Sequence, residues 1–495
     1  MANNEYIAAI EIGSSKITGA IGMHTVSGVR ILAYASEVAN NYVSKGVIRN
    51  VDEVSKSLNS LINRLESQME NVHIKKAYIS FCCMSIHSIA SRVSKQFDTF
   101  TKITQDIVSE MLADNEAQFK VPEGYKKLKV VPQEYRLNGD ATTSPIGTPT
   151  QSIECNYLNI IVKEQYMRQL EESFASAEIE IADSFNTARL EAEQILNDEE
   201  MNCGSAIVNI GAEITTVAIY SGKMLRKLTV IPLGSTNITK DICSEQINSA
   251  DAEQIKIFKG YNSAPDSNCP LTPEKINNII SGRMSEILKN IQYQIENSGY
   301  NIGRIIFTGG GSKLKNIQAI IEEVLPNYKY RIANYIHTPV NSDSDIPLTT
   351  GSITPALFGL LSNGTINCCE EEVIAPADAV VPEDLFRINA THDETAAPGE
   401  AATTTGEAAA TNGTTVEEES GEEEETTETP VTRAPEETTE ETTEERVIDT
   451  PTVTGKGGNK KNRIGTVIDL FTEWWNSEVT GDESDTENKN NDELI

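Results

Sequence analysis

Three glycine-containing turns in this sequence have the residue types that bind phosphate groups. Successive backbone N–H groups in such a turn can point at one anion, and glycine lets a phosphate approach the backbone closely. A lysine adds a positive charge to the first turn, and two threonines follow the second. The residues of these two turns are Gly13, Ser14, Ser15, Lys16, Gly211, Thr215 and Thr216. One hairpin turn of this kind is more often purely structural, so the prediction depends on the order and spacing of all three.

The third turn, Gly309-Gly310-Gly311 followed by Ser312, separates two apolar stretches within residues 303–322. The pattern before and after it predicts a buried strand, a turn and an amphipathic helix. Because the N-terminal end of a helix carries partial positive charge, such a turn could hold a nucleoside against that end. The sequence therefore predicts a nucleotide site made from three separate turns.

The elements that must position these turns form a repeated pattern. Residues 5–22 and 205–231 each predict a strand, a turn that begins with an acidic or amide residue, and a return strand rich in β-branched residues. This repeat predicts two similar lobes. Helices are predicted at 51–70, 163–178 and 272–299. Strands and helices alternate through most of residues 1–362, which predicts an α/β fold, whereas residues 82–160 predict a small inserted α+β subdomain.

Charge is distributed very unevenly along the chain. The 495 residues carry a formal net charge of −33, and residues 391–450 contribute −17 of it through 19 Asp or Glu against Arg433 and Arg446. This stretch is built from Glu, Thr, Ala and Pro, so it cannot bury enough surface to offset its chain entropy and is predicted to be a disordered tether. The remaining chain is moderately acidic, which argues against non-specific nucleic-acid binding.

We expect neither a targeting signal nor a membrane-spanning helix. The first residues lack a basic stretch, and Glu11 interrupts their apolar run, unlike a signal peptide. No segment reaches the roughly 18 uncharged apolar residues that a spanning helix needs. The eight cysteines form no C-x-x-C pair and the five histidines are scattered, so reduced thiols and no metal-ligand motif are expected.

Four segments together resemble the nucleotide-binding motifs of one superfamily. In order they read "AIEIGSSKITGAIG", "GSAIVNIGAEITTVAIYSGKMLRKLTVIPLGSTNITKDI", "DAEQIKIFKGY" and "RIIFTGGGSKLKNI". They are similar to the phosphate-1, phosphate-2, ribose or adenine, and adenosine motifs of the actin and Hsp70 ATPases. The sequence resembles most closely the family of FtsA, the bacterial cell-division actin homologue. "VVPQEYRLNGDATTSPIG" resembles the FtsA subdomain 1C, and "ARLEAEQILNDEEMNCGSAIVNIG" resembles its connecting helix.

The resemblance implies a two-lobed actin-like ATPase fold with an inserted α+β subdomain, followed by a disordered acidic tether and a terminal amphipathic helix. The expected boundaries are 1–81 and 162–192 for lobe 1 (1A), 82–161 for 1C, 193–245 and 301–363 for lobe 2 (2A), 246–300 for 2B, 364–458 for the linker and 462–479 for the helix.

The resemblance also assigns roles to residues in an ATP and magnesium site. It implies that the first turn contacts the β and γ phosphates, the second turn lines the opposite side, and the three glycines with Ser312 pack on adenosine. Glu253 and Lys256 would reach the ribose and base. Taken alone, that pair would be interpreted as an ordinary i,i+3 surface ion pair.

Two departures from the family pattern concern the metal. Family members usually begin both phosphate turns with Asp, but here these positions are Glu11 and Asn209, and Ala212 and Glu213 replace glycines of the second turn. Magnesium is usually held by one or two carboxylates together with phosphate oxygens. With Glu11 as the only carboxylate of the pair, holding magnesium through water, we expect ATP binding with weak or absent hydrolysis.

Residues 462–479, "NRIGTVIDLFTEWWNSEV", predict an amphipathic helix beyond the tether. Six large apolar side chains fall on one arc of about 120° on a helical wheel. They are Ile464, Val467, Ile468, Phe471, Trp474 and Trp475. Such a helix, about 18 Å long, is too short to span a bilayer and would lie in its interface, aided by four basic residues between 456 and 463. The alternative is a terminal helix that docks on the protein's own core.

The resemblance implies a scaffold that polymerises and ties FtsZ filaments and other division proteins to the cytoplasmic face of the inner membrane at the septum. Since the polar face of the terminal helix is acidic, one helix would bind reversibly, and several on a polymer would bind better. The alternatives are a small-molecule kinase, a chaperone ATPase or a pilus-assembly protein of the same superfamily.

Overall fold

The structure is a computed structural model that describes residues 5–26, 28–39, 41–262, 264, 268–333, 340–342 and 354–371. All of these residues belong to one compact unit. The acidic linker beyond 371 and the amphipathic helix at 462–479, with its six apolar residues, lie outside the described part. Within the described part, no helix is both long and apolar enough to cross a membrane.

The first sheet forms the centre of lobe 1. Its strand order is β12-β7-β1-β2-β3-β18. The strands are β1 (Ile7–Ile12), β2 (Lys16–Thr25), β3 (Gly28–Val38), β7 (Lys76–Phe81), β12 (Glu180–Asn186) and β18 (Val340–Ser342). β1, β2 and β3 form an antiparallel meander, and β7 runs parallel to β1. The hairpin predicted at 5–22 is therefore confirmed.

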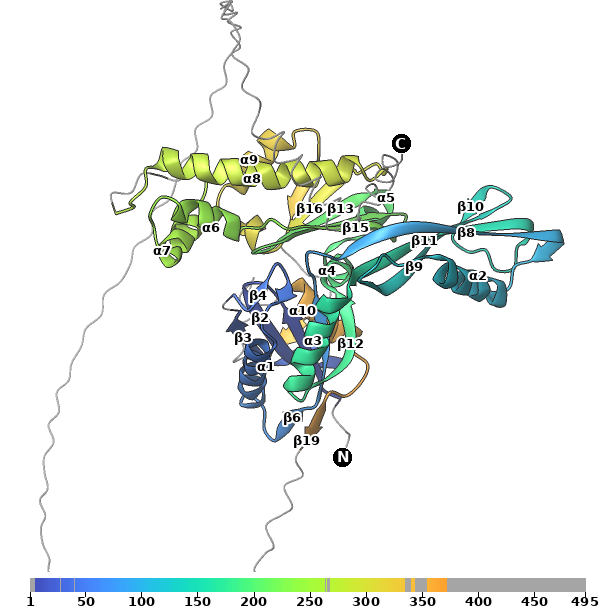
Figure 1. Cartoon of the computed structure of the whole chain (residues 1–495), viewed down its shortest axis with the longest axis horizontal. Helices are drawn as coiled ribbons and strands as arrows, with labels where there is room; N and C mark the ends of the chain where they lie inside the picture. The colour runs from blue at the N-terminus through green and yellow to red at the C-terminus, as the bar shows by residue number, and fades with distance from the viewer. Residues whose placement is uncertain are drawn as a thin grey trace, which may run out of the picture. The chain divides into compact units, whose positions relative to one another are not determined.

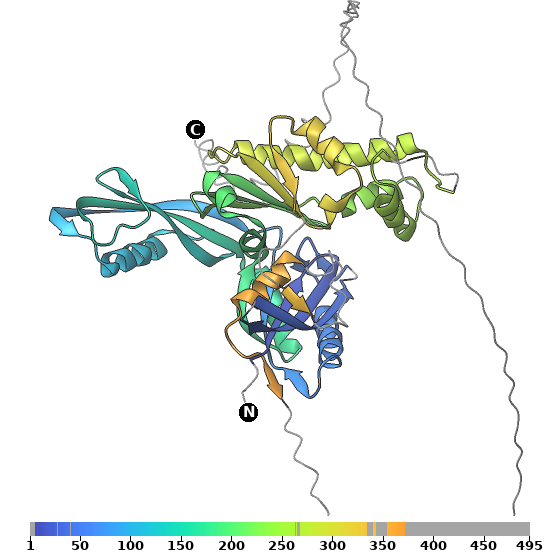
Figure 2. The same cartoon turned by 180° about the vertical axis from the view of Figure 1, so that it is seen from behind.

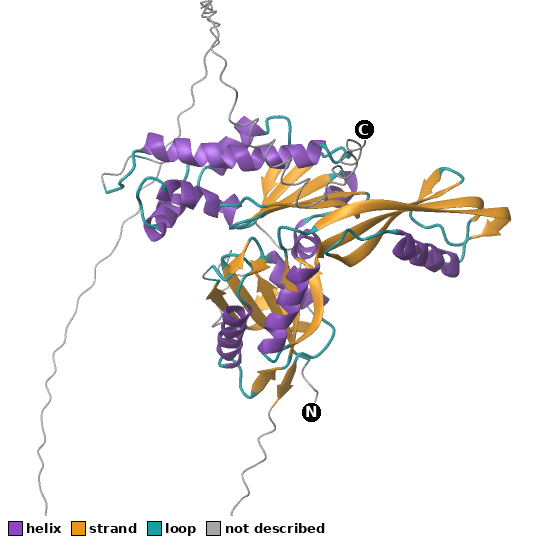
Figure 3. Cartoon of the chain, in the orientation of Figure 1, coloured by secondary structure: helices purple, strands orange, loops and turns teal. Residues whose placement is uncertain are grey.

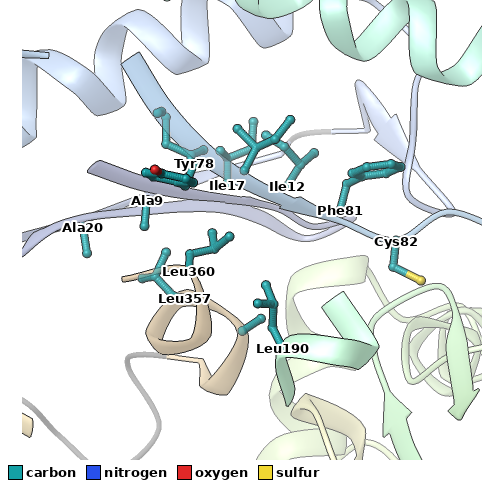
Figure 4. Packing of buried hydrophobic residues seen from close by; sticks show 14 of the residues in the cluster. Ala9, Ile12, Ile17, Ala20, Tyr78, Phe81, Cys82, Leu190, Leu357 and Leu360 are labelled. Atoms are coloured by element: carbon teal, nitrogen blue, oxygen red, sulfur yellow. The ribbon is translucent and has the colours of Figure 1, made fainter. Parts of the chain in front are cut away.

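Helices cover both faces of this sheet. α1 (Val51–Glu66) and α3 (Glu164–Ser176) pack together, and α4 (Thr187–Ile195) packs against α10 (Pro355–Asn363). A Cβ atom built on Gly19 would lie 3.0 Å from Leu65 of α1, and one built on Gly22 would lie 3.3 Å from Leu361 of α10. Figure 4 shows Leu190 of α4 with Leu357 and Leu360 of α10 beneath the strands, and Figure 2 shows α10 in orange against the blue strands.

An α+β subdomain is inserted after β7. It contains β8 (His87–Lys102), α2 (Gln105–Gln118), β9 (Tyr125–Leu137), β10 (Asp140–Thr142) and β11 (Pro149–Lys163). The sheet order is β10-β9-β11-β8, and α2 lies along this sheet (Figures 1 and 3). Met111 of α2 and Tyr157 of β11 belong to a separate buried cluster, so this subdomain has its own core.

The second sheet forms the centre of lobe 2 and repeats the plan of the first. Its order is β15-β14-β13-β16-β17, with β13–β14–β15 antiparallel and β16 parallel to β13. The strands are β13 (Ser205–Ile210), β14 (Thr215–Ser221), β15 (Met224–Ile231), β16 (Arg304–Thr308) and β17 (Tyr330–Ile332). The predicted repeat at 205–231 is thus confirmed, and two lobes are built on the same strand pattern.

The helices of lobe 2 pack mainly on one face of its sheet. They are α5 (Asp198–Cys203), α6 (Thr236–Cys243), α7 (Ser249–Gln254), a π-helix (Ile255–Lys259), α8 (Pro273–Glu296), a 3₁₀ helix (Gly310–Lys313) and α9 (Ile317–Val324). Neighbouring residues of a strand point to opposite faces. Accordingly, Val208 packs in the cluster formed with α8 and α9, whereas Ile207 joins the cluster of lobe 1.

The ordered fold continues beyond Asn363, the residue at which we expect it to end. Two short pairs complete it: β4 (Val43–Ser44) with β5 (Val47–Ile48), and β6 (Val72–Ile74) with β19 (Cys369–Glu371). Cys368 O accepts hydrogen bonds from the backbone of Lys75 and Lys76, at 2.9 and 3.1 Å. Cys368 and Cys369 are buried. These contacts keep residues 364–371 in lobe 1, and an acidic linker can begin only after them.

Candidate functional site

The first two turns have the same backbone geometry. Gly13 N donates to Lys16 O at 3.1 Å, and Gly211 N donates to Ile214 O at 2.9 Å. A Cβ atom on either glycine would lie 2.9 Å from the carbonyl oxygen that its N–H bonds. Both turns therefore require glycine for the same steric reason, as expected if they perform the same task.

Other backbone groups brace each turn. In lobe 1, Ser15 O accepts from Ala39 N at 3.0 Å, and Ser14 Oγ accepts from Gly46 N at 2.8 Å. In lobe 2, Gly211 O accepts from Ser235 N at 2.9 Å. The carbonyl oxygens of Ser15 and Gly211 already accept hydrogen bonds within the protein. Neither turn therefore needs to change its conformation to pair these oxygens when it binds an anion.

The side chains of the second turn are engaged with the protein itself. Thr215 Oγ1 donates to Leu233 O at 2.8 Å, and Thr216 Oγ1 lies 3.3 Å from Cys82 Sγ of lobe 1. Thr215 therefore supports the strand, and Thr216 supports the contact between lobes. Whether either hydroxyl also contacts a phosphate stays a prediction.

An acidic centre lies between the two turns. Asn209 Nδ2 donates to Glu191 Oε1 at 2.6 Å, and Thr354 Oγ1 donates to Glu11 Oε2. Burial raises the pKa of Glu11, against hydrogen bonds from Thr354 and Thr18 and the charge of Lys16. Burial, and then the charge of Glu11, raise the pKa of Glu191 to about 8. The structure therefore brings Glu11 and Asn209 to one centre, together with a second carboxyl group.

Glu191 is a functional candidate that our sequence analysis missed. It lies in α4, where Ala188, Ala192 and Ile195 are also buried. The spacing 188, 191, 192, 195 is that of the buried face of a helix, so an acidic residue at 191 breaks an apolar pattern. That interruption was the signal available in the sequence.

This donor set is compatible with one magnesium ion held partly by a nucleotide. Among the described residues, no three Asp, Glu, His or Cys side chains are grouped as a metal site. Two carboxyl groups and one amide can supply only part of an octahedral shell, and magnesium commonly takes the rest from water and phosphate oxygens. Glu11 is the residue that would hold such an ion, and a bound ion would neutralise charge on the phosphates.

The three-glycine turn packs against the end of β13. Gly309 has φ +84°, and a Cβ atom there would lie 2.2 Å from Asn209 Oδ1. A Cβ atom on Gly311 would lie 2.4 Å from Ile210 Cγ2, whereas one on Gly310 would have no atom within 4 Å. Ser312 Oγ donates to Gly309 O at 2.8 Å and closes the turn. Gly310 thus leaves open space where a flat ring could approach the backbone.

The expected helix directly after this turn is different in the structure. Gly310–Lys313 form a 3₁₀ helix, and α9 begins only at Ile317, after Asn316 in the left-handed region. Gly311 and Ser312 are buried, so the chain turns inward before α9 can begin. A nucleoside at Gly310 would therefore meet the 3₁₀ turn rather than the end of an α-helix.

Glu253 and Lys256 are bonded to each other. Lys256 Nζ donates to Glu253 Oε2 at 2.7 Å and to Thr239 Oγ1 at 3.0 Å, and Lys256 is only 7% exposed. Lys256 Nζ also lies 3.4 Å from Ser235 O, whose residue braces the second turn. The pair is thus partly buried rather than an ordinary surface ion pair. Its contact with ribose or base stays a prediction.

Comparisons with known proteins agree with this arrangement. The family model described as "Cell division protein FtsA" matches residues 206–347. The cell division protein FtsA of Porphyromonas gingivalis is 27% identical over 347 residues, 65% of this chain and 71% of the relative. That of Bacillus subtilis is 25% identical over 68% of this chain and 80% of the relative.

Solved structures give weaker likenesses. The PilM-PilN type IV pilus biogenesis complex is 15% identical, covering 68% of this chain and 90% of its own, at a TM-score of 0.49. MreB 5 of Spiroplasma citri bound to AMPPNP is 14% identical, and the match covers 66% of this chain and 91% of the MreB 5 chain at a TM-score of 0.37. At these scores the likeness carries no conclusion, and the fold follows from the topology itself.

Two lobes with the same antiparallel meander and parallel strand, each presenting a glycine turn to one acidic centre, define an actin-like protein. Within that class, the chain is similar to the FtsA family: its motifs predict this, the family model matches residues 206–347, and the FtsA relatives match at 27% and 25% identity.

Proposed function

We propose that this protein is an ATP-binding, actin-like scaffold of bacterial cell division. The observation that carries the proposal is the pair of matched turns, Gly13–Lys16 and Gly211–Thr216, beside the open face of Gly310. The FtsA relatives, which are named for cell division, support the process. ATP would be held by backbone N–H groups of both turns, with Lys16 as a positive charge and Glu11 on magnesium.

We expect ATP to act mainly as a ligand rather than as a substrate that is turned over quickly. Asn209 supplies no negative charge to the metal, and its amide already bonds Glu191 at 2.6 Å. Phosphoryl transfer depends largely on positioning and on metal neutralisation of charge, so the loss of one carboxylate should slow it.

Titration calorimetry with ATP and magnesium, combined with phosphate release, tests both parts. We expect saturable binding and slow release. Brisk magnesium-dependent turnover would contradict the scaffold, and turnover that requires a small-molecule phosphate acceptor would indicate the kinase alternative. A Lys16→Met variant should bind ATP at least tenfold more weakly, because it loses one charge-assisted contact with phosphate. Lys56→Met is the matched control, since Lys56 is an exposed residue of α1 that pairs with Glu53.

The membrane and partner proposals depend on residues 462–479. We propose that their apolar face lies in the interface of the inner membrane and that the protein polymerises there and holds FtsZ and other division proteins on the cytoplasmic side, at the septum. Since one short helix binds marginally, polymerisation would raise the effective concentration of helices.

Vesicle flotation of the full chain tests this proposal. The variant Trp474→Ala with Trp475→Ala should lose most flotation on anionic vesicles, whereas Thr466→Ala on the opposite face should keep it. Adding FtsZ should bring FtsZ to the vesicles only when the protein with both tryptophans is present. Unchanged flotation of the double variant would refute the membrane anchor, and flotation without FtsZ recruitment would refute the partner.

A further inference from the structure

The carboxylate of Glu213 crosses from the second turn to the other lobe. Its Oε2 accepts a hydrogen bond from the backbone N–H of Lys45 in lobe 1, at 2.7 Å. Its Oε1 lies 3.6 Å from Lys240 Nζ of lobe 2, and the Glu213 side chain is only 17% exposed. A charged acceptor that is largely removed from water makes a stronger hydrogen bond than a neutral or exposed one.

The segment held by Glu213 is closely packed and is hydrogen-bonded to the first turn. Lys45 and Gly46 join β4 to β5, and Lys45 has φ +52°. Lys45 O accepts from Met84 N at 3.0 Å, and Gly46 N donates to Ser14 Oγ at 2.8 Å. A Cβ atom on Gly46 would lie 1.9 Å from Cys82 O, so the connection packs directly on β7's continuation. A hydrogen bond that fixes Lys45 therefore also restrains the first turn, through Gly46 and Ser14.

The segment that presents Glu213 is equally well supported. Ala212 O accepts from Thr236 N at 2.7 Å, which ties the second turn to the start of α6. A Cβ atom on Gly234 would lie 2.7 Å from Glu213 N, so the two segments pack without a side chain between them. Glu213 thus extends from a backbone position that is already held in place. The hydrogen bond to Lys45 therefore costs little additional backbone entropy.

We propose that Glu213 is a built-in clasp that holds the two phosphate-type turns together without nucleotide. When a phosphate bridges two such turns, its oxygens accept backbone N–H groups from both sides. Here a carboxylate of lobe 2 accepts one from lobe 1. Closure of the lobes then does not require ATP, and nucleotide adds contacts to lobes that are already closed. Only the identity of the nucleotide rests on the proposed function.

Other contacts between the lobes, including the packing of Ile207 in the cluster of lobe 1, limit the size of the effect. Thr216 Oγ1 lies 3.3 Å from Cys82 Sγ, and Asn209 bonds Glu191 at 2.6 Å. Both contacts remain when Glu213 is changed. Removal of the clasp should therefore increase the rate of amide exchange in the Lys45 segment by about tenfold or more, the effect of losing one charge-assisted hydrogen bond. The lobes should not separate completely.

Amide hydrogen exchange of the nucleotide-free full chain tests the clasp at residues 43–48. In the native sequence, exchange should be slow and should change little when ATP and magnesium are added. In Glu213→Ala it should be about tenfold faster without nucleotide, and ATP should restore slow exchange. Glu213→Gln keeps an acceptor oxygen but loses the charge, so it should be intermediate. Glu245→Ala is the matched control, because Glu245 pairs with Lys275 within lobe 2.

Two results would overturn the clasp: native-like exchange in Glu213→Ala, or at least tenfold slowing of the native protein by ATP. Fast exchange in Glu213→Ala that ATP does not slow would support the clasp and count against the ATP site alone. If Glu213→Ala does not fold, Glu213→Gln decides, since unchanged exchange in that variant and in Lys240→Met would refute any role of the charge.

Discussion

The ion pair between Arg331 and Glu200 gives the sharpest prediction for stability. Arg331 Nε and Nη2 each donate to one Glu200 oxygen at 2.7 Å, and Nη2 also donates to Ile195 O at 2.9 Å. Glu200 belongs to α5 and Arg331 to β17, so the pair joins two distant segments of lobe 2. Asn197 N donates to Glu200 Oε2 at 3.1 Å and completes the N-terminal cap of α5.

Arg331→Met removes the main partner of a buried carboxylate. Breaking a buried pair on one side costs about 3–5 kcal/mol. Two donors remain, Asn197 N and Arg304 Nη1 at 3.4 Å, and the Arg331 side chain is itself 19% exposed. We therefore expect a loss of about 2–3 kcal/mol at pH 7, below the full cost of breaking such a pair.

The same pair predicts a pH dependence. Burial disfavours the charged form of Glu200, but hydrogen bonds from Arg331 and Asn197 outweigh burial and hold the pKa of Glu200 below its ordinary value. A lowered pKa in the folded state contributes stability above the unfolded pKa of about 4.5, and this is lost as the pH falls through the folded pKa. The difference between the native protein and Arg331→Met should therefore shrink as the pH falls below about 4.5.

Urea denaturation followed by circular dichroism, at several pH values between 7 and 3.5, measures both effects. Lys126→Met is the control, because Lys126 and Glu171 form an ion pair that is about half exposed. Such pairs contribute about 0–1 kcal/mol. Two results would contradict this role of the ion pair: a shift of the Arg331→Met transition at pH 7 no larger than that of Lys126→Met, or a loss of stability in Arg331→Met that does not depend on pH.

Three further predictions concern the site and the inserted subdomain. Gly309→Ala should destabilise the protein by about 2 kcal/mol or more and abolish ATP binding, because Gly309 has a positive φ and no space for a Cβ atom. Gly310→Ala should fold normally and only weaken ATP binding, because a Cβ atom there meets no other atom. Urea denaturation measures the stability of both variants, and calorimetry measures their ATP binding. Burial lowers the pKa of His87, so the free energy of unfolding should fall by up to about 1.4 kcal/mol per pH unit as the pH drops below 6.5. In His87→Phe, the midpoint of urea unfolding should therefore depend less on pH between pH 7 and 5 than it does in the native protein. Glu191→Gln keeps the acceptor for Asn209, so it should change stability by less than about 1 kcal/mol and reduce any ATP turnover, measured by phosphate release, to background.

Local patterns predicted the turns and the strands beside them correctly. Gly13 and Gly211 each follow a short apolar strand, and the return strands are rich in β-branched residues, so hairpins were identifiable without tertiary information. The strand β16 was also predicted, from the apolar run before the three glycines, whereas β7 and the parallel pairing were not. The predictions succeed where the determining residues lie within about ten positions of one another.

The features that the sequence analysis missed depend on distant partners. Glu213 bonds Lys45 across 168 positions, and the sequence indicated only that Glu213 replaces a glycine of the second turn. β19 pairs with β6, nearly 300 positions earlier in the chain, and residues 364–371 are too polar for a hydrophobic pattern to indicate a strand. The helical pattern could have indicated that Glu191 is buried, but its partner Asn209 lies 18 positions later and is not predictable from that pattern.

The short strand β19 determines where mechanical load would enter the fold. It pairs with β6, while Tyr6 Oη donates to Glu371 Oε1 at 2.9 Å and Cys368 N donates to Tyr6 O at 2.7 Å. Tension on the chain beyond Glu371 would therefore pass into lobe 1, beside its first strand, and would bypass lobe 2. A pull from that end would load these hydrogen bonds before any contact between the lobes.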